Sequence, residues 1–300
     1  MKRVTFYTDH EWAFGSIHLE LCKYLFSKHI DAQLLPWSTR YSVEEMAELD
    51  VITDVYVTTP TGYNVLVHDY MIDPSKIVVV VHGIIDFYDI INTHGQAEFD
   101  RPKVFAVVSE FLRTKACELG IAREPIVLPL GINTNRYHVP PATVLRTVGY
   151  AAAFRRVDDH TGYDLKRGYL VEQCAAAAGL KCKVAQTYHH SYVTMPGFYE
   201  SVDCIITAST EEGAGLPALE AGAAGRLVIS TAVGHWPEKV GDKGGHEVPM
   251  DEAAFMAETT KLLQSYKADS TAFAQKCHAI QKHAASYDWS NAIDQWIAVL

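Results

Sequence analysis

Two successive series of short apolar runs constrain this chain more than any other feature of its sequence. The runs of the first series are 3–9, 31–37, 54–60, 76–83, 103–109 and 125–131. Those of the second series are 147–153, 180–187, 203–209 and 226–232. Several runs are β-branched and apolar throughout, and helix-like patterns separate many of them. This alternation favours parallel sheets that are covered by helices on both faces.

The polar stretch between the two series indicates two domains. It covers 132–146 and contains the pair Pro140-Pro141, which is typical of a linker. A chain of 300 residues is sufficient for two domains of roughly 150 residues each. We therefore predict an α/β protein with two doubly wound, Rossmann-like domains, 1–139 and 142–300, the second ending in helices. Because ligands bind outside the carboxyl ends of strands in such sheets, we expect the functional residues in an interdomain cleft.

Composition and charge narrow the classes of protein. The formal net charge is −10, which disfavours indiscriminate binding of nucleic acid. The segment 136–190 nevertheless holds eight basic and four acidic residues, which suits an anionic small molecule or a solvated face equally well. The six cysteines form no CxxC pair and no HExxH is present, so we expect free thiols and no metal site.

The sequence shows no sign of a membrane segment. No apolar run approaches the roughly 18 residues that a membrane span needs. The N-terminus begins with a strand-like run and has no long apolar core of a signal peptide. We therefore expect a cytoplasmic protein without an integral membrane segment. The oligomeric state is not legible from the sequence.

The stretch EEGAGLPALEAGAAGRLVIST, residues 211–231, places two glutamates around a glycine turn. It follows an apolar run directly, so the turn is expected at the carboxyl end of a buried strand. Gly213 and Gly215 would let the backbone approach a ligand closely, and Pro217 fits the first turn of a helix. The N-terminus of that helix would be a favourable seat for phosphate.

From physical chemistry alone, the two glutamates of this stretch have two explanations. Glu212 would face the cleft and Glu220 would lie one turn into the helix, where a carboxylate can accept hydrogen bonds from a ribose diol. Alternatively, one is a solvated side chain and the other stabilises the helix dipole. The residues of the turn do not decide between these explanations.

The segment 211–238 resembles the glutamate–seven–glutamate signature of retaining GT-B glycosyltransferases of family 4. The positions in register with that signature are Glu212, Gly213, Gly215, Leu216, Pro217, Glu220, Ala221, Gly225, Gly234, Pro237 and Glu238. Ala214 stands where the family usually has an aromatic residue, and Arg226 stands where it usually has proline. The segments 107–121, 127–138, 195–209 and 287–297 are also similar to the family, so the resemblance covers most of the chain. In such proteins the last of these segments often crosses back to the first domain.

The resemblance implies an enzyme that moves a hexose from a UDP- or GDP-sugar to an acceptor hydroxyl with retention. The nucleotide sugar is the donor substrate, and no cofactor or metal is expected. Glu220 would hold the ribose. The transferred sugar would be held by Glu212 and by the amides of Gly213, Ala214, Gly215 and Leu216.

Without metal, fixed cations must stabilise the diphosphate leaving group. The family supplies a lysine and an arginine from the first strand–loop–helix of its C-terminal domain. Lys166 matches the lysine. Tyr150 stands where the arginine is expected, so Arg155 or Arg156 would reach in from a longer loop, or Arg167 would take that place.

The first domain contributes three further candidates. Gly15 and Ser16 precede a helix expected over 17–29, so their N–H groups could meet a sugar or the distal phosphate, as the resemblance also implies. His82 lies at the carboxyl end of a buried strand, where the family often has a histidine that contacts the transferred sugar. Each of these residues is explained equally well by a structural role.

The acceptor is not legible, and two classes stay open. One is the hydroxyl of a glycan, lipid or small metabolite. The other is a hydroxymethylated base in DNA, because compact chains of this kind resemble viral and phage glycosyltransferases. Residues 1–140 hold 12 basic and 18 acidic residues, which argues mildly against DNA. A nucleotide-sugar epimerase, or a protein that only binds sugar nucleotides, would use the same fold.

Overall fold

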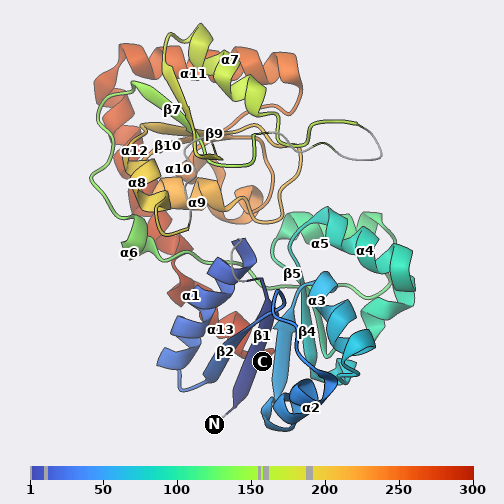
Figure 1. The fold of residues 1–300 in the computed structure, drawn as a ribbon. Coiled ribbons are helices and arrows are strands. Elements are labelled where there is room, and N and C mark those ends of the chain that lie inside the picture. The colour runs from blue at the N-terminus through green and yellow to red at the C-terminus, as the bar shows by residue number, and fades with distance from the viewer. Residues whose placement is uncertain (1, 10–12, 155–156, 158–161, 187–191) are drawn as a thin grey trace. The chain divides into compact units, whose positions relative to one another are not determined.

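The computed structural model describes residues 2–9, 13–154, 157, 162–186 and 192–300. The chain divides into two compact units, each with its own sheet (Figure 1). The first unit comprises Met1–Gly131 and Trp289–Leu300, and the second comprises Ile132–Asp288.

In its described part, the first unit holds a six-stranded parallel sheet in the order β2-β1-β3-β4-β5-β6. Its strands are β1 (Arg3–Thr8), β2 (Asp31–Pro36), β3 (Val55–Thr58), β4 (Ile77–Val81), β5 (Val104–Val107) and β6 (Ile126–Val127). Every residue of β3 and β4 is buried. The apolar runs of the first series therefore form the strands predicted from them.

Helices cover this first sheet. They are α1 (Ala13–Ser27), α2 (Val43–Ile52), α3 (Pro60–Asn64), α4 (Ile84–His94), α5 (Glu110–Glu118) and α13 (Ile293–Ile297), with the short turns η1 (Val65–Asp69), η2 (Pro74–Lys76), η3 (Gln96–Asp100) and η7 (Trp289–Asn291). In Figure 1, α1 and α13 lie together on one side of the sheet, and these two helices are in contact. Ser109 is the N-cap of α5, because its hydroxyl accepts a hydrogen bond from the amide of Leu112 at 3.4 Å.

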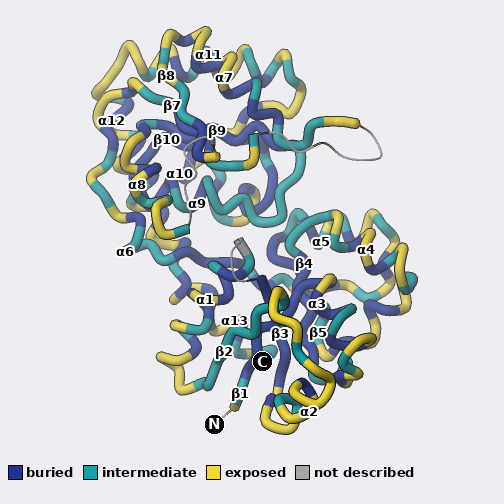
Figure 2. Tube along the Cα trace, in the orientation of Figure 1, coloured by how far each residue is buried: buried dark blue, intermediate teal, exposed yellow. Residues whose placement is uncertain are grey.

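The described part of the second unit has a five-stranded parallel sheet in the order β11-β10-β9-β7-β8. Its strands are β7 (Thr147–Tyr150), β8 (Lys181–Val184), β9 (Cys204–Thr207), β10 (Leu227–Ser230) and β11 (His246–Glu247). Its helices are α6 (Thr134–Tyr137), α7 (Gly168–Ala177), α8 (Met195–Glu200), α9 (Leu216–Ala223), α10 (Gly241–Gly244), α11 (Glu252–Ala268) and α12 (Ser270–Ala284), with η5 (Trp236–Val240) and η6 (Ala285–Tyr287). The strands β9 and β10 are fully buried in its core (Figure 2).

The boundary between the units lies before the expected linker at Pro140-Pro141. The guanidinium of Arg226 donates to the carbonyl of Pro140 at 3.2 Å, and the amide of Ala142 donates to the carbonyl of Gly225 at 3.0 Å. These bonds attach the stretch 132–146 to the second unit. A pair of prolines marks an irregular stretch in the sequence, but it does not say to which core that stretch is bonded.

The C-terminal segment Trp289–Leu300 belongs to the first unit. The predicted boundaries placed it in the second domain, whereas the family resemblance implies that it crosses back to the first. The indole N–H of Trp296 donates to the carbonyl of Pro129 at 3.0 Å. The ammonium of Lys103 donates to the carbonyl of Leu300 at 2.8 Å. Trp296 is fully buried, so this segment completes the core of the first unit.

Candidate functional site

The glycine turn of the sequence motif connects β9 to α9. Gly215 is the N-cap of α9, with φ 68° and ψ 41° in the left-handed region that favours glycine. Pro217 occupies the first turn of this helix, as predicted. In the described part of the chain, the amides of Ala214, Gly215 and Leu216 donate no hydrogen bond. This end of α9 therefore presents N–H groups that a ligand can use.

The loop after β10 packs against this turn. The amide of His235 donates to the carbonyl of Ala214 at 2.9 Å. Gly234, with φ 59°, lies so close that a Cβ at its position would be 2.6 Å from that carbonyl oxygen. Burial lowers the pKa of His235, whose Nδ1 lies 2.9 Å from the Glu238 carboxylate. This close packing fixes the position of the glycine turn.

Lys166 and Glu212 form an ion pair beside the glycine turn. The ammonium of Lys166 lies 2.5 Å from Glu212 Oε1, and the hydroxyl of Ser209 donates to the same oxygen at 2.7 Å. The two charged side chains are only 12% and 15% exposed. Among the described residues Glu212 Oε2 accepts no hydrogen bond, and the ammonium of Lys166 has further N–H donors. The pair thus offers a cation and an acceptor next to each other.

Backbone contacts bring Lys166 to this position. The amide of Thr210 donates to the carbonyl of Leu165 at 2.9 Å. The hydroxyl of Tyr150 lies within hydrogen-bonding distance of the carbonyls of Ala153 (3.1 Å) and Lys166 (3.0 Å). Tyr150 stands where the family arginine is expected, and here its hydroxyl binds both ends of the loop that carries Lys166.

Arg167 is buried and bonded to the backbone of the second unit. It is 1% exposed, and its guanidinium donates to the carbonyls of Ala208 and Met250, both at 2.6 Å. Its backbone is left-handed, with φ 49°. These contacts make Arg167 a structural link between β9 and the segment before α11. Among the described residues its Nη2 has no hydrogen-bond partner, and a role of Arg167 at the diphosphate stays a prediction.

The remaining arginine candidates, Arg155 and Arg156, lie outside the described residues. Nothing in the described part of the chain tests whether either reaches the diphosphate. Both stay candidates on the sequence alone.

Glu220 lies on α9, and two tyrosine hydroxyls donate to its carboxylate. Tyr137 of α6 donates to Oε1 at 2.8 Å, and Tyr199 of α8 donates to Oε2 at 2.6 Å. Burial raises the pKa of Glu220, while the two tyrosine hydroxyls and the nearby Arg136 act to lower it. Burial and the carboxylate together raise the pKa values of both tyrosines. The tyrosines are therefore neutral donors at neutral pH.

Arg136 extends this cluster. Its guanidinium donates to the carbonyl of Tyr192 at 2.6 Å and lies 3.8 Å from the centroid of the Tyr192 ring. It also lies 5.9 Å from the centroid of the Tyr137 ring. An arginine in these contacts adds positive charge close to Glu220 without forming an ion pair with it.

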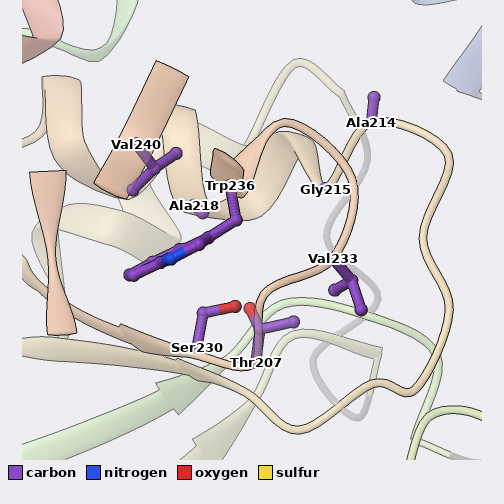
Figure 3. A pocket seen from close by; sticks show the side chains of 8 residues that line it. All are labelled: Thr207, Ala214, Gly215, Ala218, Ser230, Val233, Trp236 and Val240. Carbon is purple, nitrogen blue, oxygen red and sulfur yellow. The ribbon is translucent and has the colours of Figure 1, made fainter. Parts of the chain in front are cut away.

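A small pocket lies beside the glycine turn (Figure 3). Figure 3 shows the indole of Trp236 across the pocket from the side chains of Ser230 and Thr207. The indole N–H donates to Glu247 at 2.9 Å, which fixes the ring. Because Ala214 and Gly215 form part of its wall, the pocket belongs to the support of the turn.

In the first unit, Gly15 and Ser16 lie within α1, which begins at Ala13, before the predicted start. The Gly15 amide donates to the carboxylate of Asp9 at 3.2 Å. A Cβ on Gly15 would lie 2.6 Å from the carbonyl oxygen of Asp9. The Gly15 amide is thus bonded within the protein, and glycine is required here for close packing. A contact of this amide with a sugar or phosphate, which would have to replace its bond to Asp9, stays a prediction.

His82 follows β4 directly, at the carboxyl end of the strand as expected. Its amide donates to the carboxylate of Asp86 at 2.7 Å, and its ring lies 4.7 Å from that of Phe14. The ring of His18, which the sequence did not single out, lies 6.1 Å away. His18 is fully buried, and burial together with the nearby His82 holds its pKa well below the usual range.

Two further findings concern metal and membrane. In the part of the chain that the structure describes, no group of three or more His, Cys, Asp or Glu side chains is arranged to hold a metal ion. Within that same part, no helix has both the length and the apolar character needed to cross a membrane.

A family model matches part of the second unit. Residues 162–265, which contain Lys166, Glu212 and Glu220, match the family model described as Glycosyl transferases group 1. No curated protein matches the sequence.

Solved structures are similar over the whole chain. Sucrose-phosphate synthase from Thermosynechococcus elongatus has a TM-score of 0.74 at 13% identity, covering 100% of this chain and 98% of that one. HepE from Anabaena, in complex with UDP-glucose, has a TM-score of 0.71 at 13% identity and covers 100% of both chains. A glycosyltransferase from Rickettsia africae has a TM-score of 0.67 at 15% identity, covering 99% and 97%.

The chain has the GT-B fold. This confirms the predicted fold class, since both parallel sheets with their helices match those structures. The family match and the GT-B fold together support a transferase enzyme of the glycosyltransferase class, as predicted.

Sequence reasoning missed the residues that hold the two glutamates in place. Ser209 lies two residues before the motif and ends an apolar run, so a signal for it was present. Tyr137 and Tyr199 lie 83 and 21 positions from Glu220, and no local pattern connects them to it. Only the folded chain brings them together.

Proposed function

We propose that this GT-B protein is a family 4-like glycosyltransferase that moves a hexose from a nucleoside diphosphate sugar to an acceptor hydroxyl, with retention and without metal. The observation that carries the proposal is the Lys166–Glu212 pair beside a glycine turn whose helix also holds Glu220. A cation, a carboxylate and unpaired amides converge there, as a sugar diphosphate requires.

Each group has a role in the proposal. Lys166 stabilises the charge that develops on the diphosphate as it leaves. The sugar hydroxyls donate hydrogen bonds to Glu212 Oε2. They accept hydrogen bonds from the amides of Ala214, Gly215 and Leu216. Glu220 accepts hydrogen bonds from the ribose. In the first unit His82 remains a candidate for contact with the transferred sugar, on the basis of the family resemblance.

The proposed reaction forms one bond and breaks one bond on the same face of the sugar. The acceptor oxygen attacks the anomeric carbon while the bond from that carbon to the diphosphate oxygen breaks. The bonding electrons leave with the nucleoside diphosphate, and the proton of the acceptor hydroxyl passes to a departing phosphate oxygen. In this mechanism no carboxylate of the protein forms a covalent intermediate.

A UDP-sugar is the first donor to test. HepE, which has been solved in complex with UDP-glucose, shares the fold over the whole length of both chains. The acceptor is either the hydroxyl of a glycan, lipid or small metabolite, or a hydroxymethylated base in DNA.

A donor screen tests the proposal. The melting temperature of the protein is measured with UDP-glucose, UDP-N-acetylglucosamine, GDP-mannose and the free nucleotides, since a ligand that binds only the folded state raises it. Nucleotide release is then measured with a panel of glycans and with hydroxymethylated DNA. Stabilisation followed by acceptor-dependent release supports transfer. Stabilisation without release with any acceptor would indicate a binding protein, and conversion of the donor sugar without acceptor would indicate an epimerase.

A further inference from the structure

Both oxygens of Glu220 already accept a hydrogen bond from a phenol. Tyr137 comes from α6 and Tyr199 from α8, so three separate elements meet at this one carboxylate. Tyr137 is 2% exposed and Tyr199 is fully buried. Their rings pack edge to face with centroids 5.7 Å apart. The two hydroxyls are therefore held by packing as well as by the carboxylate.

A carboxylate that accepts two hydrogen bonds from phenols can still accept more. An ionised carboxylate has about four lone-pair sites on its two oxygens. Tyr137 and Tyr199 occupy one site on each oxygen, which leaves one site on each. Two acceptor sites at the spacing of one carboxylate match a pair of neighbouring hydroxyls.

Glu220 would be difficult to ionise without these donors. Burial disfavours the charged carboxylate and raises its pKa, whereas Tyr199, Tyr137 and Arg136 act in the opposite direction. Arg136 bonds elsewhere, through the carbonyl of Tyr192. Among the described residues, the phenols are thus the two groups that bond directly to the carboxylate.

Other elements packed against α9 bring few charges to Glu220. From β9 and α12 come the buried thiols of Cys204 and Cys277, and burial raises the pKa of each. On α12 the ammonium of Lys276 donates to the carbonyl of Asp242, and a ring nitrogen of His283 lies 2.9 Å from the carbonyl of Lys239. The two other titratable side chains of α12, which are exposed, are His278 and Lys282.

We propose that Tyr137 and Tyr199 are positioning residues that keep Glu220 ionised and turn its two remaining acceptor sites toward the 2′- and 3′-hydroxyls of the donor ribose. The ribose part rests on the proposed function, whereas the effect of the tyrosines on Glu220 does not. By fixing both oxygens, the phenols make Glu220 a site for a ribose diol, and a nucleotide that lacks the 2′-hydroxyl fills only one of the two acceptor sites.

The first experiment uses the protein without any nucleotide. The side-chain carboxyl carbon of Glu220 is followed by ¹³C NMR over a pH titration, and its signal is assigned by its absence in Glu220→Gln. The variants are Tyr137→Phe and Tyr199→Phe. Tyr287→Phe is the matched control, because Tyr287 is also buried next to α9 but its hydroxyl has no partner in the described part of the chain.

Removal of either phenol is expected to raise the pKa of Glu220, since a donor to the charged form is lost while the burial remains. The control is expected to titrate as the unmodified protein does. If both tyrosine variants titrate like the control, the phenols do not hold the charge and the inference is overturned. A folded-state melt of each variant confirms that the titration reports native protein.

The second experiment measures nucleotide affinity against pH. In the unmodified protein, UDP is expected to bind at least tenfold more tightly than 2′-deoxy-UDP, because a hydrogen bond to a charged group is lost with the 2′-hydroxyl. In Tyr137→Phe and Tyr199→Phe this preference is expected to shrink. The loss of UDP affinity on acidification is expected to begin at higher pH, because binding needs the ionised carboxylate.

The two experiments separate the two proposals. A raised pKa in the titration with no binding of any nucleotide or nucleotide sugar of the donor screen by the unmodified protein would overturn the proposed function and the ribose part, and leave the effect of the tyrosines established. UDP binding with an unchanged 2′-hydroxyl preference and an unchanged acid limb in both variants would overturn the ribose part alone. A purely structural role of the tyrosines would lower the melting temperature and leave both pH profiles where they are.

Discussion

Lys166 and Glu212 lie in direct contact as an ion pair. Their side chains are mostly buried, so the ion pair is screened less by water than a surface pair. A diphosphate that takes up hydrogen bonds from Lys166 would weaken its bond to Glu212, and that carboxylate would then be available to a sugar hydroxyl. The pair therefore couples the diphosphate to the sugar in the proposed reaction.

The first prediction concerns Lys166. Lys166→Ala is expected to lower kcat about 100-fold or more and to change the donor KM less, because the lysine acts mainly on charge that develops as the diphosphate leaves. Steady-state kinetics with the donor found in the screen measure this. Lys181→Ala, an exposed lysine of the same unit, is the control and is expected to be neutral. An unchanged kcat in Lys166→Ala would remove this residue from the mechanism.

The second prediction concerns metal. If Lys166 supplies the charge on the diphosphate, turnover should be unaffected by EDTA. The assay compares rates before and after chelation and again after Mn²⁺ or Mg²⁺ is added. Loss of turnover with EDTA and its rescue by Mn²⁺ would show that a divalent cation carries that charge.

The third prediction concerns the effect of the buried Glu220 carboxylate on the stability of the fold. Burial raises the pKa of Glu220 in the folded protein above its value in the unfolded chain. Between these two pKa values the folded state binds more protons than the unfolded state, so the free energy of unfolding falls as pH rises through that range. Glu220→Gln is therefore expected to leave the melting temperature at pH 7 unchanged or raised, with any gain disappearing in acid. Nucleotide affinity should fall sharply in the same variant. A large loss of stability at pH 7 would show that the carboxylate has a mainly structural role.

At the scale of elements, the glycine turn depends on the loop that supports it. Gly234 lies against Ala214 with no room for a Cβ, and its positive φ is strained for any other residue. The position of the amides at the start of α9 thus depends on a contact between the loop after β9 and the loop after β10.

The fourth prediction tests that support. Gly234→Ala is expected to displace the turn, lowering nucleotide affinity and destabilising the fold by roughly 1–3 kcal/mol. Gly241→Ala is the matched control, because Gly241 also has a positive φ of 45° but nothing lies within 4 Å of its added Cβ. Melting curves and nucleotide titrations of both variants separate strain from displacement. Equal loss of affinity in both would mean that the contact with Ala214 is unimportant.

At the scale of the whole molecule, the chain builds its two units from three stretches. The first unit is completed by Trp289–Leu300, which follows the entire second unit in the sequence. Each sheet is nevertheless formed within one stretch of chain, because the strands of the first sheet all lie in 1–131 and those of the second all lie in 132–288. The C-terminal segment adds long-range packing to a sheet that is otherwise formed by residues 1–131.

The fifth prediction concerns that packing. Trp296→Ala is expected to destabilise the first unit by about 3–5 kcal/mol, through loss of a fully buried side chain and of its bond to Pro129. Gln295→Ala, an exposed neighbour, is the control and is expected to be nearly neutral. Hydrogen exchange followed by mass spectrometry reports each unit separately. Equal loss of protection in both units, or none in the first, would contradict the assignment of this segment.

Much of the fold followed from the sequence, because strands and capped helices are written in local patterns. The apolar runs predicted the strands β1 to β10, and Ser109 predicted the start of α5. The short strand β11, which has two residues, left too little pattern to detect. The two-domain division was also predicted, but its boundary was misplaced by the prolines at 140 and 141.

The candidate site was predicted in part. Lys166, Glu212 and Glu220 were named from a motif and a resemblance, and the structure brings the first two into direct contact. Arg167 and Gly15 were named from position in the sequence, and the structure bonds both within the protein. A sequence gives the type of a side chain, whereas its direction and its partners depend on the packing of other elements.

The sequence by itself determined where the chain forms strands and where its glycine turn and acidic residues lie, because these follow from the order of neighbouring residues. Only the tertiary structure decided that Tyr137 and Tyr199 bond to Glu220, and that the Tyr150 hydroxyl lies against the backbone of the loop that carries Lys166. The physical reason is that each of these contacts joins different elements, 16 to 83 positions apart in the chain, and its geometry is fixed by the packing of the second unit.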